Sequence, residues 1–178
     1  MSGTKLETRE LGYMTIANDR IFVIERKIAP AVVQEWINRL DGAALKTFRH
    51  IPEETDLQWC ALAPADPDSK YDGFEYNRGP YRMVAYASLR QVASEEVRFV
   101  WAVVEEFRGL GLGKLMARFA TDMAIRYRNR KISAVVDYGH ATAINILEME
   151  DFDISTPIDD HESMSGKVVK LVKELRWQ

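Results

Sequence analysis

Residues 97–130, with the sequence VRFVWAVVEEFRGLGLGKLMARFATDMAIRYRNR, decide the fold of this chain. The segment begins with an apolar run that ends at Val104, and such a run is typical of a buried strand. The segment is predicted to fold as a strand, a glycine turn and a helix. After the glycines, apolar side chains recur with the spacing of one buried helix face, at Leu112, Leu115, Met116, Phe119, Ala120, Met123 and Tyr127.

The glycine turn at residues 108–113, RGLGLG, is a candidate phosphate site. The first turn of a helix leaves backbone N–H groups without internal acceptors, and the helix dipole favours an anion there. Arg108 adds a guanidinium that suits phosphate oxygens. A dinucleotide fingerprint is excluded because Lys114 stands where its third glycine belongs, and a P-loop is excluded because Leu115 follows the lysine. The alternative is a tight turn that joins strand and helix without a ligand.

The order strand, R-x-x-G-x-G and helix resembles the acyl-CoA signature of the GNAT superfamily of N-acetyltransferases. The resemblance implies that the turn cradles the pyrophosphate of coenzyme A and that the backbone of the preceding strand binds the pantetheine arm. Acetyl-CoA is then the expected cofactor, and no metal ligands are expected. The implied cofactor-binding residues are Trp101, Ala102, Val103, Arg108, Gly109, Leu110, Gly111, Leu112, Gly113 and His140.

The rest of the chain is predicted to alternate strands and helices. This order predicts an α/β fold with a mixed sheet, helices on both sides and the central helix as a parallel crossover. The GNAT resemblance adds a V-shaped opening between the family's fourth and fifth strands, here 97–104 and 132–136. We expect polar, frayed residues at 1–11, helices at 30–40, 43–51 and 142–149, and a polar turn at 157–165. Strands are expected at 13–16, 21–24, 57–63, 83–92, 152–154 and 168–177, and the apolar spacing of the last segment is also compatible with a helix.

Length and composition fit a single domain. The chain has 178 residues, of which 47% are apolar and 29% charged, and its net charge is −3. We expect one domain over residues 1–178, with its core at about 20–175 and a loop insertion at 64–80. The mild acidity argues against nucleic acid or a membrane as partner. Cys60 is interpreted as a buried hydrophobe, and the polar N-terminus resembles no signal segment, so a cytoplasmic protein is expected.

A second GNAT pattern, N-x-x-A-x-x-L-Y-x-x-x-G-F, matches residues 140–152 in spacing and in its apolar positions. His140 stands at the position of its asparagine and can still donate a hydrogen bond to the pantetheine or amine region. Leu147 stands at the position of its tyrosine, which often protonates the leaving thiolate, and leucine cannot do so. Tyr138, the nearest phenol in the sequence, is the candidate acid, and the alternative is a half-buried tyrosine of the strand.

The candidate general base is Glu96. GNAT domains that acetylate protein lysines tend to carry a glutamate ten residues before the motif arginine, and that position here is Arg98. Glu96 lies two residues earlier, so on a regular strand it shares the face of Arg98. The guanidinium is expected to lower the pKa of Glu96, which weakens this carboxylate as a base. Glu105 is a second carboxylate that could act through water.

These patterns predict an N-acetyltransferase in which a primary amine attacks acetyl-CoA directly in a ternary complex. The missing glutamate and tyrosine leave open a non-catalytic acyl-CoA-binding domain with a regulatory or sensor role. A phosphate-binding domain whose basic helix contacts nucleic acid is a third interpretation, which the net charge disfavours. The predicted acceptor is a small amine or a protein lysine, and the likeness to lysine-acetylating GNAT domains extends to Arg39-Leu40 and Phe48-Arg49.

Two further features bear on partners. The final strand ends at Trp177 and is a candidate edge for pairing two subunits as a homodimer. Residues 148–162 contain acids but no lysine or arginine, so this patch either attracts a cationic amine or is a solvated surface. The acids are Glu148, Glu150, Asp151, Asp153, Asp159, Asp160 and Glu162.

Overall fold

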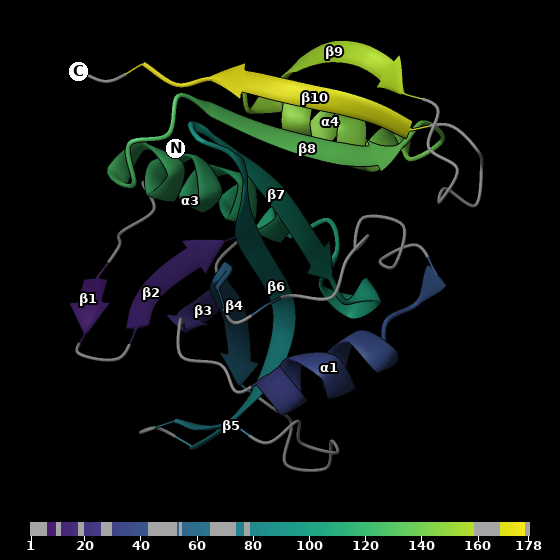
Figure 1. The fold of residues 1–178 in the computed structure, drawn as a ribbon. Helices are drawn as coiled ribbons and strands as arrows, with labels where there is room; N and C mark the ends of the chain where they lie inside the picture. Colours follow the sequence, from purple (N-terminus) through teal and green to yellow (C-terminus); the bar gives the residue numbers. More distant parts are fainter. Residues whose placement is uncertain are drawn as a thin grey trace.

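The computed structural model of the chain describes residues 7–9, 12–17, 20–25, 30–42, 53, 55–64, 74–76, 79–158 and 168–176. In these residues, ten strands form one sheet in the order β1-β2-β3-β4-β6-β7-β8-β10-β9, with β5 paired to β6 (Figure 1). The helices are α1 (Pro30–Asn38), α3 (Leu112–Arg126) and α4 (Ala141–Met149), with a 3-10 helix, η1 (Glu105–Phe107). The strands are β1 (Glu7–Arg9), β2 (Gly12–Ala17), β3 (Arg20–Glu25), β4 (Leu57–Pro64), β5 (Phe74–Tyr76), β6 (Gly79–Ala93), β7 (Glu96–Val103), β8 (Lys131–Asp137), β9 (Asp153–Ile158) and β10 (Val168–Glu174).

The central segment folds as its pattern predicts. β7 leads through η1 into α3, and α3 crosses over to β8, which pairs with β7 in parallel. The other strand pairs in the described part of the chain are antiparallel. The prediction of a mixed α/β sheet with a parallel crossover is therefore confirmed.

β7 and β8 separate along their length, which confirms the predicted V-shaped opening. Their pairing consists of Glu96 with Lys131, Val97 with Ile132, and Arg98 with Ser133. Beyond this vertex β7 stays paired with β6 as far as Val103, and β8 stays paired with β10, so each strand follows its own partner (Figure 1). Among the described residues, the facing edges of β7 and β8 beyond the vertex consequently carry backbone N–H and C=O groups that no neighbouring strand satisfies.

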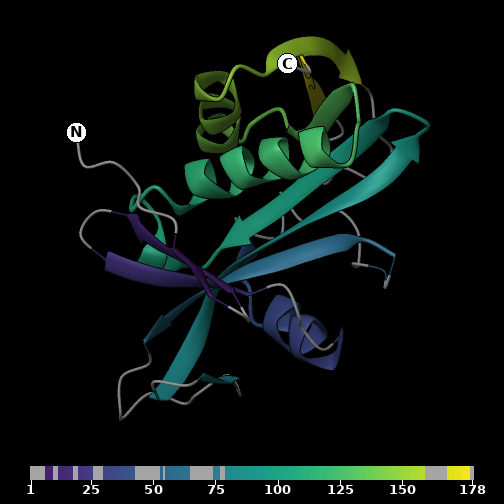
Figure 2. The same ribbon diagram turned by 90° about the vertical axis from the view of Figure 1, so that its left-hand side faces the viewer.

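Helices cover both faces of the sheet, as predicted. Figure 2 shows α3 and α1 on opposite sides of the central strands. Side chains alternate along β4: Trp59 belongs to the core cluster that contains α3 and α4 residues, whereas Cys60 belongs to the cluster around α1. Cys60 is fully buried, as expected. On the α3 side, the rings of Phe99 and Trp101 stack with their centroids 4.8 Å apart.

Two expectations near the N-terminal half need correction. The polar residues Glu7–Arg9, expected to fray, form β1 and pair with β2, because an adjacent strand satisfies their backbone groups. The predicted loop at 64–80 contains β5, which pairs with the start of β6. β6 therefore begins at Gly79, earlier than predicted. The rest of this loop and the predicted helix at 43–51 lie outside the described residues.

Two expectations near the C-terminus are also wrong. The polar turn predicted from residue 157 starts too early, because Pro157 and Ile158 belong to β9 and pair with β10. β10 itself lies between β8 and β9, so the final strand is not an edge that a second subunit could extend. A homodimer therefore stays a prediction that pairing through the final strand no longer supports. Trp177 lies outside the described residues.

None of the helices in the described ranges combines the length and the apolar character needed to cross a bilayer.

Candidate functional site

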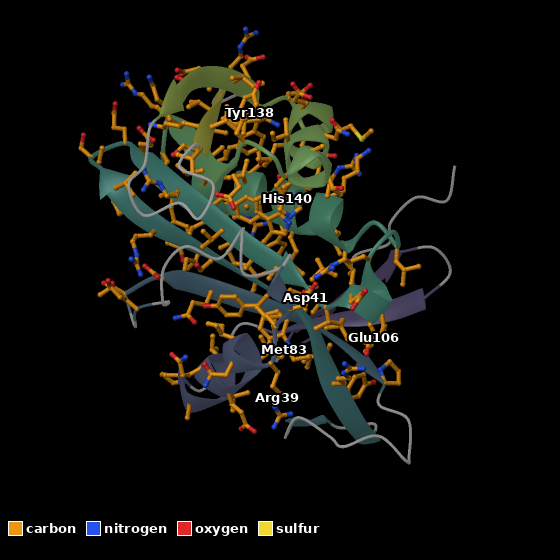
Figure 3. All side chains as sticks on the ribbon, turned by 90° about the vertical axis from the view of Figure 1, so that its right-hand side faces the viewer. Arg39, Asp41, Met83, Glu106, Tyr138 and His140 are labelled. Atoms are coloured by element: carbon orange, nitrogen blue, oxygen red, sulfur yellow. The ribbon has the colours of Figure 1, made fainter. Side chains whose placement is uncertain are left out.

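A cavity of about 450 Å³ lies where the carboxyl end of β7 meets the first turn of α3 and the start of α4. Figure 3 views the molecule from the side on which the two strands open. Nine of the ten residues predicted to bind a cofactor line this cavity, and Leu110 does not. The lining residues are Trp101, Ala102, Val103, Phe107, Arg108, Gly109, Gly111, Leu112, Gly113, Lys114, His140, Thr142, Ala143 and Ile146.

The loop before α3 presents its backbone to the cavity. Gly109 and Gly111 have φ angles of 73° and 84°, a region that residues with a Cβ rarely adopt. Gly111 is the N-cap of α3 and supplies no side-chain cap. The first helical hydrogen bond runs from the Leu115 N–H to the Gly111 carbonyl, so the preceding N–H groups have no acceptor within the helix. This arrangement fits a diphosphate group.

Gly113 packs closely against α4 and β7, and its backbone angle is not left-handed. A Cβ at this position would lie 3.1 Å from Cδ1 of Ile146 on α4 and 3.5 Å from Nε1 of Trp101 on β7. The glycine thus allows α3 to approach α4 and β7 closely beside the cavity.

Arg108 connects the loop to two other parts of the chain. Its Nε donates to the Val103 carbonyl at 3.1 Å, and Nη1 donates to Oδ2 of Asp41 at 3.0 Å. Nη2 donates to the other carboxylate oxygen of Asp41. The guanidinium therefore fixes the end of β7, and phosphate binding by this side chain stays a prediction. Lys114, which the sequence analysis did not select, lines the cavity with a partly exposed ammonium.

His140 is the N-cap of α4. Its Nδ1 accepts a hydrogen bond from the Ala143 N–H at 3.3 Å, so the neutral imidazole carries its proton on Nε2. The ring lines the cavity, where this proton is suited to bind a ligand acceptor. Leu147, at the position of the family's tyrosine, is fully buried in the core and does not reach the cavity.

The two predicted catalytic residues do not meet at the cavity. Tyr138 is 62% exposed and lies outside the lining, and Figure 3 labels it at the edge of the domain beyond His140. Glu96 lies at the vertex of the opening, seven residues or about 23 Å of strand from Val103. An acid–base pair of Glu96 and Tyr138 is therefore not supported by the geometry.

Glu96 is held by two partners across the sheet. The Lys170 ammonium lies 2.8 Å from its carboxylate, and the Ser133 hydroxyl donates to it at 2.6 Å. Burial alone would raise the pKa of Glu96, but the hydrogen bonds from Lys170 and Ser133 and the charges of Lys170 and Arg98 lower it. A carboxylate with a lowered pKa is a poor proton acceptor. The sequence analysis predicted this effect from Arg98 alone, and the structure adds Lys170 and Ser133 as causes.

Part of the acidic patch at 148–162 is neutralised by basic residues from elsewhere. Glu150 is only 7% exposed, its carboxylate accepts from Nε of Arg118 at 2.9 Å, and the Lys114 ammonium lies 3.7 Å away. Asp151 faces Lys173 at 3.8 Å. Among the described residues, Glu150 and Asp151 are therefore partly neutralised, and attraction of a cationic amine by the rest of the patch stays a prediction.

The fold and this cavity define a class of protein. The profile of the acetyltransferase (GNAT) family matches residues 33–150, and the chain belongs to this family. The predictions of a GNAT fold, of an acetyltransferase and of acetyl-CoA as the cofactor are confirmed at the level of the family. No curated protein matches the sequence significantly.

Solved structures share the fold at low sequence identity. A ribosomal-protein-S18-alanine N-acetyltransferase from Escherichia coli has a TM-score of 0.63 and 17% identity, covering 88% of this chain and 96% of its own. A phosphinothricin acetyltransferase from Sinorhizobium meliloti, solved with acetyl-CoA, has a TM-score of 0.61 and 16% identity, covering 86% and 88%. An IAA acetyltransferase from Bacillus cereus has a TM-score of 0.62 and 16% identity, covering 86% and 99%.

Proposed function

We propose that the protein transfers the acetyl group of acetyl-CoA to a primary amine by direct attack in a ternary complex. The observation that carries the proposal is the continuity of the cavity with the unpaired edge of β7. The cavity begins at the open N–H groups of α3, which suit the pyrophosphate, and it extends back along β7 as far as Trp101. On its β8 side this stretch of β7 faces no strand, so its backbone can bind the amides of the pantetheine arm.

The residues of this chain supply binding, orientation and polarisation. Bound acetyl-CoA supplies an activated thioester whose thiol leaving group has a pKa near that of cysteine, about 8.5. Backbone N–H groups between Trp101 and Val103 are suited to polarise the carbonyl of an acyl group held there. The Nε2 proton of His140 can orient the ligand from the α4 side. Positioning of this kind contributes a large part of the rate in acyl transfer.

Proton transfer fits a solvent route better than a dedicated base. Of the residues that line the cavity, His140 is the side chain most often used as a general base, and its Nδ1 is occupied by the Ala143 N–H. The amine must therefore arrive neutral or lose its proton to water. With a primary amine of high pKa, kcat/KM is expected to rise with pH toward the pKa of the acceptor, without a plateau set by Glu96.

Calorimetric titration of acetyl-CoA into the wild-type protein and into Gly111→Asp tests the cofactor site. The variant places a Cβ at a left-handed backbone position and a negative charge beside the pyrophosphate, so its affinity should fall at least about 100-fold. Ser94→Asp, which adds the same charge in the exposed turn at the opposite end of β7, is the control and should bind normally.

Two outcomes would change the assignment. No acetyl-CoA binding to the wild-type chain would contradict the cofactor site itself. Binding without thiol release over a panel of amines would favour a regulatory acyl-CoA-binding domain. This alternative remains open because Arg98 and Leu147 stand at the positions of the family's catalytic glutamate and tyrosine.

A further inference from the structure

Arg108, the arginine of the glycine motif, is already bound within the protein. Its Nε donates to the Val103 carbonyl, and Nη1 and Nη2 donate to the two carboxylate oxygens of Asp41. A guanidinium that a carboxylate binds through two nitrogens contributes little net charge to its surroundings. A phosphate would have to compete with Asp41 for the same two nitrogens. The motif arginine is therefore held as a clamp between the end of β7 and the segment that follows α1.

Lys114 is the second cationic side chain on the cavity wall, and it is held less tightly. It is the third residue of α3, in the same first turn as the N–H groups that the helix leaves without acceptors. Its side chain is 42% exposed, and its ammonium lies 3.7 Å from a carboxylate oxygen of Glu150, which is beyond hydrogen-bond distance. Within the described part of the chain, this is the one ion pair that Lys114 forms.

The carboxylate of Glu150 has a closer partner than Lys114. Both of its oxygens accept hydrogen bonds from Nε of Arg118, at 3.1 and 2.9 Å. Lys173 completes this ion-paired group, because its ammonium donates to the Glu150 backbone carbonyl at 2.8 Å and lies 3.8 Å from the Asp151 carboxylate. Three cations thus face two carboxylates, so the group retains one positive charge. Lys114 is the member of the group that lines the cavity.

The charge of coenzyme A needs a cation of this kind. The molecule carries a pyrophosphate and a 3′-phosphate, all of them anionic. The N–H groups of the first turn of α3 bind phosphate oxygens as neutral donors and supply only the partial charge of the helix end. A lysine ammonium acts on phosphate as a point charge, and the ammonium of Lys114 has to give up only a long contact with Glu150.

We infer that Lys114, and not the motif arginine, supplies the cationic side chain that binds the phosphate groups of coenzyme A. The inference rests on the proposed coenzyme A site and names the residue that recognises the charge of this ligand. Arg108 and Asp41 keep their ion pair and hold the end of β7 to the segment after α1. The glycine loop contributes backbone donors, and Lys114 contributes the charge from the same helix turn.

Calorimetric titration of coenzyme A into wild type and Lys114→Gln tests the inference. The variant removes one positive charge, so its affinity should fall about 5- to 20-fold at low salt, and the difference should shrink at high salt. Lys114→Arg keeps the charge and should stay within about three-fold of wild type. Arg126→Gln, which removes an exposed arginine from the other end of α3, is the charge-matched control and should bind normally.

The same titrations with 3′-dephospho-coenzyme A identify the phosphate. A loss in Lys114→Gln that is confined to coenzyme A assigns the ammonium to the 3′-phosphate, and an equal loss with both ligands assigns it to the pyrophosphate. Either result supports the inference. The melting temperature of ligand-free Lys114→Gln should stay within about 2 °C of wild type, because the pair with Glu150 is long and the lysine is partly exposed. A lower melting temperature with unchanged affinity would instead mean a purely structural role and overturn the inference.

The double variant Arg108→Gln/Asp41→Asn removes the clamp as a neutral pair. Because both charges are lost together, affinity for coenzyme A should stay within about three-fold of wild type. A loss larger than that of Lys114→Gln would show that Arg108 binds phosphate, and it would overturn the inference. Should the double variant not fold, Lys114→Gln and its controls still decide the matter.

The inference and the proposed function can fail separately. Unchanged affinity for both ligands in Lys114→Gln, beside normal binding to wild type, would reject the role of Lys114 and leave the cofactor site in place. Failure of the wild-type protein to bind coenzyme A or acetyl-CoA would instead reject the proposed function. No turnover is measured in these titrations, so an absence of acetyl transfer does not affect their outcome.

Discussion

The cofactor side and the vertex side of the opening are built in different ways. The cofactor side is main chain: two left-handed glycines and the first N–H groups of α3, contributed by one continuous segment. The vertex side is made of side chains from β7, β8 and β10, with Glu96, Ser133 and Lys170 brought together across the sheet. A main-chain site needs glycines at fixed spacing, whereas a side-chain site leaves no such local pattern.

The largest expected effect concerns Leu147, at the position where the family carries a catalytic tyrosine. Because this side chain is fully buried in the core, Leu147→Ala should lower the free energy of unfolding by about 2–5 kcal/mol. Met149→Ala, at an exposed position of α4, should change it by less than about 0.5 kcal/mol. Urea denaturation measures both, and lost turnover at unchanged stability in Leu147→Ala would give this position a catalytic role instead.

A smaller effect tests the close packing on the cofactor side. Gly113→Val should lower stability by about 1–3 kcal/mol, because its Cβ alone would lie 3.1 Å from Cδ1 of Ile146 and its methyl groups need further space. Acetyl-CoA affinity should fall at least about 10-fold as α4 moves from α3. Adding Ile146→Ala should restore part of both losses, since it removes the atom nearest to the new Cβ. If the double variant behaves as the sum of the single ones, the contact does not explain the glycine.

The vertex side is expected to show in the acid dependence of stability. Glu96 has a lowered pKa, so its contribution is complete above its ordinary value near 4.5 and disappears as pH falls through the folded-state pKa. Between pH 6 and pH 3, wild type should lose about 1 kcal/mol more than Glu96→Gln. Glu174→Gln, which removes a well-exposed partner of Lys131, is the control. Equal slopes for wild type and Glu96→Gln in chemical denaturation would contradict the role of the Lys170 pair.

The smallest effect concerns Asp41, whose carboxylate forms an ion pair with the Arg108 guanidinium beside the loop. Asp41→Asn removes a negative charge near the proposed pyrophosphate site and frees the arginine. Acetyl-CoA affinity should therefore rise about two- to five-fold at low salt and return toward wild type at high salt. Glu35→Gln, on α1 and paired with Arg39, should change nothing. A weaker affinity in Asp41→Asn would mean that fixing the end of β7 matters more than the charge.

Much of the fold and of the cofactor side could be predicted from the sequence. The helix period of residues 112–127 and the apolar strand before it determined the crossover unit. The glycine spacing selected nine residues that line the cavity. The edges of the sheet could not be predicted in this way, because β1 and β5 are short strands that form only when a neighbour satisfies their backbone.

By itself, the sequence determined the features that lie within one continuous segment: the strand, the glycine loop and the helix, with the family they indicate. Only the tertiary structure decided the partners of charged side chains, since those partners are far away in the chain. Glu96 was selected as a base, but Lys170 and Ser133 bind it across the sheet. Arg98 was regarded as a substitution that weakens catalysis, and in the structure its charge acts together with that of Lys170 to lower the pKa of Glu96. The physical reason is that a backbone site depends on local conformation, whereas the pairing of charges depends on which strands the fold makes adjacent.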